Sequence, residues 1–365
     1  LDPSFGNGGI SEVDLDSGQD YCKVIALQPD GKMLLAGESS SGLGLVRFNT
    51  DGSIDHSFGN NGKVVMPFPG YGIEPCKLSV LQDGKIMVVA SWNTGTISDY
   101  DIVLIRFMGD GSLDGSFGNG GVNLAALPGV QTARAAVMLP DKSIVTTGIG
   151  NTNRCIVAKF TPNGKLDMRF GVDGVSTVNV VDDDLTNAIY WQMDGKIVVG
   201  GRARDTGERF FLVRLNADGN LDRGFGTNGI TQTLIEDRSS LAALAMQNDG
   251  RILAVGTSSR RNADPNGSTE ITIARYHGDM SASVKEGQYT SIECYPNPAN
   301  TLLNISGADA DCYYQVTSIT GQVLIQGKCT GHDISIDISS LLSGNYLFSI
   351  IKAYKTTYVQ RFVKS

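Results

Sequence analysis

The sequence has few of the residues that catalytic and nucleic-acid-binding sites usually need. Its 365 residues include three histidines and two tryptophans, and 30 lysines and arginines stand against 38 aspartates and glutamates. A net charge of −8 without a basic cluster disfavours nucleic acid as a partner. Because apolar runs of roughly 18 residues are missing, we expect no transmembrane segment. The chain begins at Leu1, so we also expect a processed N-terminus.

Catalytic motifs are scarce as well. The sequence contains no HExxH, P-loop or dinucleotide-binding fingerprint, and no GxSxG elbow. His56 and His277 fall in segments that repeat along the chain, and His332 lies in the tail. The loops that vary therefore lack a histidine for a Ser-His-Asp triad. Most enzyme classes are disfavoured, although a glycoside hydrolase that uses only carboxylates stays open.

The six cysteines have no metal-binding or redox spacing. They are Cys22, Cys76, Cys155, Cys294, Cys312 and Cys329. An even count permits disulfides, but the spacing identifies none, and we expect buried or free thiols. Whether Cys22 and Cys76, at near-equivalent places in neighbouring repeats, form a bridge stays open.

Glycine, by contrast, is abundant, with 45 residues, and much of it lies in a phrase written five times. The copies read LDPSFGNGG, IDHSFGNNG, LDGSFGNGG, LDMRFGVDG and LDRGFGTNG. Their phenylalanines are Phe5, Phe58, Phe117, Phe170 and Phe225, at steps of 53, 59, 53 and 55 residues. A period of about 50 residues is typical of stacked or circular arrays of one supersecondary unit.

Each unit predicts four short antiparallel strands. In the first unit, CKVIALQP and KMLLAGES flank a hairpin turn at Asp30-Gly31, LGLVRFN follows, and KVVM comes after the FGNNG phrase. Four such strands at even spacing predict a β-propeller blade. A helical solenoid is excluded because no segment keeps a 3.6-residue period.

The count of strands predicts how the array closes. Three inner strands occur five times, at about 22–48, 76–107, 134–160, 186–215 and 241–276, but a fourth strand follows only the first four units. The chain opens with an unmatched FGNGGISEVD. We therefore predict an all-β fold with a five-bladed propeller over residues 1–278, closed by a strand at about 9–14 that completes the fifth blade.

The repeated phrase has a structural explanation. Its aspartate caps backbone N–H groups, its phenylalanine packs between blades, and its glycines adopt backbone angles that other residues resist. The oxygen-rich segment 49–55 also suggests a calcium loop. However, Arg47 stands where the first ligand should be and no bidentate glutamate follows. We therefore expect no cofactor, with calcium as the weaker alternative.

These residues resemble a known family. LDPSFGNGGI, the QxDGKI hairpin and the RF-x-x-DGxLD run are similar to the delta-60 repeat, a β-propeller repeat of bacterial secreted proteins. The resemblance covers roughly residues 1–278. In the third unit Asp141-Lys142 and Asn163-Gly164 replace Asp-Gly pairs, which affects the turn type and not the fold. The resemblance implies a propeller and no settled activity.

The tail differs in composition from the repeats. Residues 279–290 read as a polar linker, and residues 291–365 predict about seven alternating strands in a small immunoglobulin-like β-sandwich. This domain resembles the C-terminal sorting domain, type A, of the type IX secretion system. The residues that carry the resemblance are Pro296, Asn297, Pro298, Gly321, Gly344 and Tyr346.

The resemblance of the tail has implications for the location of the protein. It implies a Bacteroidetes-like bacterium, contact with the type IX secretion machinery and export across the outer membrane. The protein would then be secreted or attached to the outer surface. The alternative is an accessory immunoglobulin-like binding module.

Any ligand site of the propeller is expected on the loops that differ between units, because binding residues lie on loops that a rigid scaffold holds. Acidic and aromatic residues gather there. The candidate ligand-binding residues are Asp16, Asp20, Tyr71, Glu74, Trp92, Tyr100, Asp183, Asp184, Glu236 and Asp237. The alternatives are solvated loop charge and partly buried loop packing. Arginines of these loops could meet an anionic ligand or pair with the nearby acids Asp205, Glu208 and Asp264. They are Arg202, Arg204, Arg209, Arg260 and Arg261.

Three functions compete at this point. The leading hypothesis is a non-catalytic binding module for a glycan or a protein. The second is a polysaccharide-acting propeller enzyme whose two carboxylates serve as in glycoside hydrolases. The third is a purely structural surface component. We do not predict a catalytic residue or a metal ligand.

Overall fold

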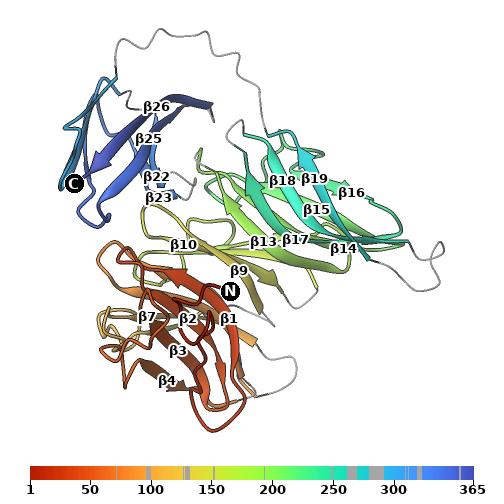
Figure 1. Ribbon diagram of the computed structural model, residues 1–365. Coiled ribbons are helices and arrows are strands. Elements are labelled where there is room, and N and C mark those ends of the chain that lie inside the picture. The colour runs from red at the N-terminus through yellow and green to blue at the C-terminus, as the bar shows by residue number, and fades with distance from the viewer. Residues whose placement is uncertain are drawn as a thin grey trace. The chain divides into compact units, whose positions relative to one another are not determined.

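The computed structural model consists of strands joined by turns and loops (Figure 1). It describes residues 1–70, 72–95, 100–125, 127, 132–150, 153–192, 194–247, 250–260, 269–278, 292–308, 310, 312–318, 323–352 and 355–365. Across these residues no helix is long and apolar enough to span a membrane. The chain divides into two compact units. The larger is Leu1–Trp191, Lys196–Leu244 and Ala254–Ile273; the smaller is Gln192–Gly195, Ala245–Leu253 and Ala274–Ser365.

The first four repeats each form a four-stranded antiparallel sheet in chain order. Blade 1 is β1 (Tyr21–Leu27), β2 (Met33–Ser39), β3 (Gly42–Phe48) and β4 (Lys63–Pro67). Blade 2 is β5 (Gly72–Val80), β6 (Ile86–Asn93), β7 (Tyr100–Phe107) and β8 (Val122–Ala125). Blade 3 is β9 (Thr132–Met138), β10 (Ile144–Ile149), β11 (Cys155–Phe160) and β12 (Val175–Val178). Blade 4 is β13 (Asp184–Trp191), β14 (Ile197–Arg204), β15 (Glu208–Leu215) and β16 (Ile230–Thr233).

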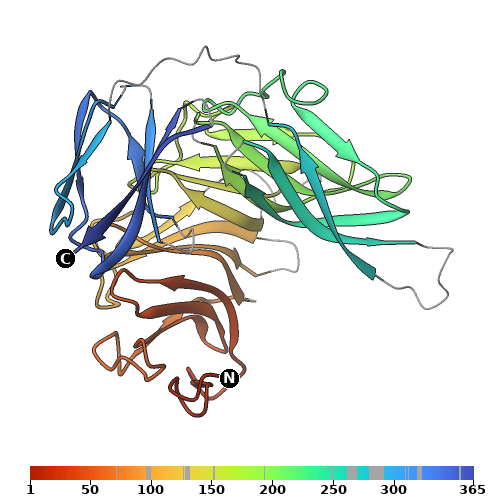
Figure 2. The same ribbon diagram turned by 45° about the horizontal axis from the view of Figure 1, so that its top comes forward.

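The fifth repeat forms three strands: β17 (Arg238–Met246), β18 (Ile252–Ser259) and β19 (Thr269–Tyr276). A single parallel bridge between Glu208 and Arg238 joins this blade to blade 4. The predicted inner and fourth strands of the repeats are thus present, and the fold is all-β and propeller-like. Figure 2 shows the successive sheets of the larger unit, coloured from red through yellow and green to teal.

Consecutive blades pack face to face. The inner strand of each blade contacts the strands of the blade before it: β5 lies against β1, β2 and β3, and β9 lies against β5, β6 and β7. Leu45 of blade 1 and Val88 of blade 2 belong to one buried cluster, and Val145 and Val199 belong to another between blades 3 and 4. Apolar residues at alternating strand positions therefore build a core between successive sheets from blade 1 to blade 4.

The predicted N-terminal strand at 9–14 does not form. Residues 11–20, all of them described, contain no strand, and the preceding phrase has one isolated bridge between Gly6 and Ile10. In the described part of the chain β19 has no fourth strand beside it, and Ile271 and Ile273 on β19 are 89% and 63% exposed. The sheets do not close into a ring, so neither closure nor the number of blades is confirmed.

The tail forms two small sheets within the smaller unit. One sheet holds β21 (Leu302–Ser306) between β20 (Glu293–Tyr295) and β24 (Asp333–Asp337). The other has the order β23 (Val323–Lys328), β22 (Tyr313–Ser318), β25 (Gly344–Lys352) and β26 (Lys355–Lys364). Ile305 of the first sheet and Phe348 of the second belong to one buried core.

The expectation that the cysteines are free thiols was wrong for one pair. Cys312 and Cys329 are joined by a disulfide, and both are buried in the core of the tail. Their separation of 17 residues, across the β22–β23 hairpin, gave no motif that could identify the pair in advance. Cys22 and Cys76 are free thiols and are not bridged to each other.

Candidate functional site

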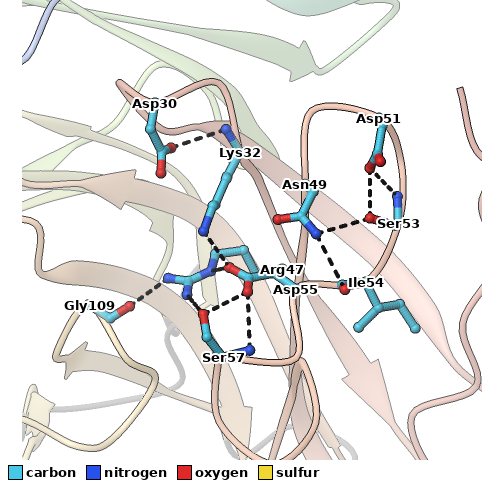
Figure 3. Close-up of polar contacts among 10 residues, drawn as sticks. All are labelled: Asp30, Lys32, Arg47, Asn49, Asp51, Ser53, Ile54, Asp55, Ser57 and Gly109. Atoms are coloured by element: carbon cyan, nitrogen blue, oxygen red, sulfur yellow. Dashed lines mark hydrogen bonds and ion pairs between the residues drawn. The ribbon is translucent and has the colours of Figure 1, made fainter. Parts of the chain in front are cut away.

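The turn face of the propeller, made by the Asp-Gly hairpins and the FGxxG phrases, is held by a buried ionic cluster (Figure 3). In blade 1 the Oδ2 of Asp55 lies 2.7 Å from Arg47 Nε and 2.8 Å from Lys32 Nζ. The Oδ1 of Asp55 accepts hydrogen bonds from the backbone N–H and hydroxyl of Ser57, at 3.1 and 2.6 Å. Arg47 Nη1 donates to the carbonyl of Gly109 in blade 2, at 2.6 Å, so the cluster also joins two blades.

The cluster recurs along the chain. Blade 2 has Lys85, Arg106 and Asp114, and blade 4 has Lys196, Arg214 and Asp222. The Ser116 hydroxyl and the Lys85 ammonium hold the pKa of Asp114 below its usual range. Blade 3 departs from this pattern because Lys159 replaces the arginine.

These contacts confirm the structural interpretation of the repeated phrase. The aspartate caps the turn. Four of the five phenylalanines are buried, namely Phe58, Phe117, Phe170 and Phe225, and Phe117 lies against Gly164 of the next blade. The lysine and arginine partners of the aspartate were not predicted from the sequence. Their signal was present, because the lysine of DGK and the arginine of RF recur in phase with the aspartate. The repeated residues thus serve the scaffold.

The opposite ends of the strands form the loop face, made by the connections into each inner strand and the hairpins between second and third strands. Two clefts lie there. The first cleft, of about 410 Å³, lies between blades 1 and 2. Its lining residues are Gln19, Tyr21, Glu38, Ser39, Ser40, Ser41, Gly42, Phe68, Gly70 and Gly72.

The first cleft combines aromatic and carboxylate groups. Tyr21 is 52% exposed. Burial and the negative charge of Glu74 raise the pKa of Glu38, against the opposing charge of Lys23. Glu38 therefore lines this cleft, whereas Glu74, which was predicted from the sequence, does not line it and acts on Glu38 through its charge.

The wall of the first cleft is fixed by its neighbours. Phe68 meets Trp92 edge to face, with ring centroids 5.5 Å apart, and Trp92 Nε1 donates to the carbonyl of Pro69 at 2.8 Å. The carboxylate of Asp16 accepts from the Ser40 hydroxyl at 2.6 Å and from the Ser41 N–H at 3.1 Å. Asp16 and Trp92 thus position the cleft and do not line it.

The second cleft, of about 340 Å³, lies at the equivalent place between blades 4 and 5. Its lining residues are Arg204, Asp205, Thr206, Gly207, Glu208, Asp237 and Arg238. Arg204 lies 3.8 Å from Glu208 and 3.9 Å from Asp183, and Arg209 binds Asp205 at 2.7 Å. The arginines therefore pair with neighbouring acids, as one of the two readings of the sequence predicted.

The other predicted residues do not line either cleft. Asp20 Oδ2 accepts from the N–H of Leu15 at 2.7 Å, and Glu236 pairs with Arg260 at 2.5 and 2.9 Å. Tyr100 begins β7 opposite Asn93. Tyr71 lies outside the described residues. In the described part of the chain no three acidic, histidine or cysteine side chains are grouped as metal ligands.

Asp184 is different because it is buried, at 1% exposure, and accepts from the N–H groups of Val180 and Val181 at 2.8 and 3.0 Å. Burial raises its pKa to about 6, and the neighbouring charge of Asp183 adds to the effect. Its carboxylate organises the connection into β13 and does not line either cleft.

Two residues that line the first cleft, Tyr21 and Glu38, were not predicted from the sequence. Glu38 ends the second strand of blade 1, opposite Tyr21. Ser91, Ile149 and Arg202 stand at the corresponding places, to judge from the strand registers. An alignment of the units with one another would have marked Glu38 as a departure at an otherwise uncharged or basic position.

In the tail the predicted sorting residues hold the last strand. Asn297 accepts from the N–H of Val363 at 2.9 Å and donates to the carbonyl of Arg361 at 3.2 Å. It stands between Pro296 and Pro298, whose peptide bonds are both cis. Gly344 pairs with Lys364, and the ring of Tyr346 stacks on Phe362 at 5.7 Å. Gly321 lies outside the described residues.

Two family models match the chain. "Domain of unknown function (DUF5122) beta-propeller" matches residues 28–58, 81–117, 192–225 and 247–279. "Secretion system C-terminal sorting domain" matches residues 293–365. No match was found among curated proteins.

Solved structures with a similar fold are distant. PorZ, described as an essential bacterial surface component of the type-IX secretion system of Porphyromonas gingivalis, is 15% identical with a TM-score of 0.41. The match covers 99% of this chain and 47% of PorZ, so the chain spans about half the length of that protein.

Two arabinan-degrading enzymes are also similar. An endo-arabinanase from Bacillus licheniformis is 13% identical, with a TM-score of 0.38 and coverage of 74% of this chain and 98% of the enzyme. An endo-arabinase from Bacteroides thetaiotaomicron is 11% identical, with a TM-score of 0.37 and coverage of 72% and 95%.

The matched family models and the geometry of the turns and the tail agree with each other. The chain carries DUF5122 β-propeller repeats followed by a type IX secretion C-terminal sorting domain, and it is exported across the outer membrane to be secreted or attached to the outer surface.

Proposed function

We propose that the propeller is a non-catalytic binding module that takes a glycan at the first cleft of its loop face. The observation that carries the proposal is the lining of this cleft, where an exposed tyrosine, a carboxylate and serine hydroxyls come from residues that are not repeated between units. The repeated residues are engaged in the scaffold, so the loops are free to differ.

The chemistry of the first cleft suits a sugar. The ring of Tyr21 offers an apolar face on which a pyranose can stack, and its hydroxyl is fixed by a hydrogen bond to Gln19 at 2.8 Å. Glu38 and the serine hydroxyls supply acceptors and donors for sugar hydroxyls. The proposal needs a site exposed outside the cell, which export of the chain supplies.

A second candidate is a polysaccharide-acting enzyme, and one observation favours it. Burial and the charge of Glu74 raise the pKa of Glu38, which lines the cleft. Glycoside hydrolases use a carboxyl group with a raised pKa as the general acid. Glu38 would then donate a proton to the glycosidic oxygen.

A thermal-shift screen of the full chain against soluble glycans tests the proposal. A ligand that binds only the folded state at a hundredfold excess over its Kd adds about 2.7 kcal/mol, which raises Tm by a few degrees. We expect a shift that Tyr21→Ala removes and that Asp51→Ala, on the turn face, keeps. A panel without any shift would contradict the proposal and favour a protein partner.

Incubation of the shifting glycan with the protein separates the two candidates. A binding module leaves the glycan intact. Cleavage that Glu38→Gln abolishes, while glycan binding by that variant persists, would establish the enzyme instead.

A further inference from the structure

The second cleft presents two arginine side chains whose N–H groups the fold leaves available. Arg238 lines the cleft at the start of β17, and its side chain is exposed. No ion pair or side-chain hydrogen bond joins it to another residue in the described part of the chain. Arg204, at the end of β14, is 57% exposed, and its ion pairs of 3.8 and 3.9 Å are longer than hydrogen bonds. Both guanidinium groups can therefore donate to a ligand.

The surroundings of this cleft also contain more guanidinium donors than acceptors. The Nε atoms of Arg202 and Arg209 are buried without a hydrogen-bond partner. Among the side chains of these two residues and of Arg204 and Arg238, the described structure forms one hydrogen bond. It runs from Arg209 Nη2 to Asp205 Oδ1, at 2.7 Å. A ligand rich in acceptor oxygens would supply what these donors lack.

The cleft holds one carboxylate that lacks a hydrogen-bond donor. The side chain of Glu208 is 19% exposed and lies 3.7 Å from Arg202 Nη1 and 3.8 Å from Arg204 Nε. Within the described residues no hydrogen bond to this carboxylate is formed. A largely buried carboxylate gains stability when a donor reaches it. The cleft therefore suits a ligand that accepts hydrogen bonds from arginine and donates one to Glu208.

The other two carboxylates that line the cleft act on arginines of their own. Asp205 binds Arg209. Glu236 and, to a smaller extent, Asp237 raise the pKa of Arg260. The charge of Arg238 is left for a ligand, and the lining residues include no aromatic ring on which a sugar could stack.

The two clefts of the loop face differ in charge at corresponding positions. Gly72 begins β5 and lines the first cleft, whereas Arg238 begins β17 and lines the second. Glu38 of blade 1 and Arg202 of blade 4 occupy corresponding places in the second strands. The carboxylate of Glu38 disfavours an anion at the first cleft, so an anion would bind selectively at the second.

We propose that the second cleft is an anion site that binds hydrogen phosphate, HPO₄²⁻. The oxygens of the ion accept from Arg204 of blade 4 and Arg238 of blade 5, and such charge-assisted hydrogen bonds are the strong ones. The P–OH group donates to Glu208. Sulfate has a similar shape and the same charge but carries no proton, so the Glu208 carboxylate repels it. The site does not rest on the glycan proposed for the first cleft.

Thermal denaturation of the full chain tests the site in mildly alkaline buffer, where phosphate is HPO₄²⁻. Inorganic phosphate, sulfate and chloride are compared at equal ionic strength. At a hundredfold excess over its Kd, phosphate should raise Tm by a few degrees through the site. Phosphate and sulfate also stabilise proteins by their exclusion from the surface. That general effect is shared by the wild type and its variants, so the differences between them measure binding.

Arg204→Gln and Arg238→Gln should each raise the phosphate concentration needed for a given Tm shift at least about tenfold. Arg223→Gln is the matched control and should respond like the wild type. Arg223 is exposed as well, lies in an FGxxG phrase of the turn face and has no ion pair to a described residue. Glu208→Gln, whose amide can donate, should let sulfate act as strongly as phosphate.

Two results of this comparison would overturn the proposal. An unchanged response to phosphate in both Arg204→Gln and Arg238→Gln would show that the cleft holds no anion. Equal responses of the wild type to phosphate and sulfate would show that Glu208 does not select a protonated anion.

Chemical modification of the wild type tests the same contacts without a variant that could misfold. Phenylglyoxal reacts with accessible guanidinium groups, and mass spectrometry of the peptides locates the modified arginines. Phosphate should slow the modification of Arg204 and Arg238 several-fold relative to chloride and should leave the rate at Arg223 unchanged. Equal rates in phosphate and chloride at all three arginines would overturn the site.

Discussion

Gly164 packs against the ring of Phe117 so closely that a Cβ at this glycine would lie 2.4 Å from Phe117 Cζ. Gly164 belongs to a turn of blade 3, and Phe117 belongs to the FGxxG phrase between β7 and β8 of blade 2. The contact therefore joins one repeat to the next, and it explains why the glycine of the turn and the phenylalanine of the phrase recur together.

Gly164→Ala is expected to destabilise the propeller more than Gly84→Ala. The two glycines have nearly the same φ, +82° and +79°, but a Cβ at Gly84 meets nothing within 4 Å. The loss of stability that comes from placing alanine at a positive φ is therefore the same in both variants. The difference between their free energies of unfolding measures the clash with Phe117, about 1–3 kcal/mol for overpacking. Chemical denaturation of both variants measures it. Equal losses would show that the contact between the blades is not tight.

Arg214→Met is expected to lower the free energy of unfolding by about 3 kcal/mol. The substitution removes the buried guanidinium that pairs with the largely buried carboxylate of Asp222. Arg214 is 1% exposed and lies 2.8 Å from Asp222 Oδ2. Arg169→Met is the matched control. Arg169 also pairs with an aspartate of the repeat, Asp167, but its side chain is 88% exposed, so we expect Tm to change little. A similar loss of stability in the two variants would contradict the expectation that the buried ion pair stabilises the fold more than the exposed one.

Asp184 is expected to make the stability of the propeller depend on pH between about 4 and 6. Burial raises its pKa from 3.8 to about 6. The folded protein therefore binds the proton more tightly than the unfolded chain, and this contribution to stability is present below the unfolded pKa and is lost as pH rises through 6. We expect the stability of the wild type relative to Asp184→Asn to fall across this range, measured by denaturation at several pH values.

Asp114 is the control, because its contribution to stability should change with pH in the opposite direction. Hydrogen bonds from Ser116 and Lys85 lower its pKa, so its contribution is present above the unfolded pKa and is lost as pH falls through the folded one. The wild type should therefore lose stability relative to Asp114→Asn on acidification. Parallel curves for the two positions would mean that the environment of Asp184 is not as described.

Asn297→Ala is expected to loosen the last strand of the sorting domain and to lower the fraction of protein that is exported. The substitution removes the hydrogen bonds to Val363 and Arg361, which should cost about 1–2 kcal/mol. Asn304→Ala, which removes only a hydrogen bond from the Ser335 hydroxyl, is the control. Secreted and cell-retained protein are compared by immunoblotting in a host with the secretion system. Unchanged export by a destabilised Asn297 variant would separate folding of the tail from sorting.

The repeat could be predicted from the sequence because the same strand and turn patterns recur several times along the chain. Alternating apolar residues, Asp-Gly turns and the FGxxG phrase give the inner strands and the first four outer strands. The strand at 9–14 could not be predicted in the same way, because a fourth strand forms only where a third strand lies beside it. Ser11 meets blade 1, and β19 belongs to the other end of the array.

The candidate site was less predictable than the fold. Charge and aromaticity marked Glu74 and Trp92, but Trp92 is fixed to Pro69 and supports the cleft from outside. Glu38 and Tyr21 line the cleft because a hairpin and a connection between blades meet there, and that meeting depends on tertiary packing. The disulfide between Cys312 and Cys329 likewise depends on the register of β22 and β23.

The most direct test of the central claim, that the loop face binds while the turn face supports, is a calorimetric titration with the glycan selected by the screen. The account predicts that Tyr21→Ala weakens binding at least about tenfold, equivalent to about 1.4 kcal/mol. Asp51→Ala, whose carboxylate bonds only to Ser53 in its own turn, should bind like the wild type. Equal affinities for the wild type and both variants would place the site elsewhere and contradict the claim.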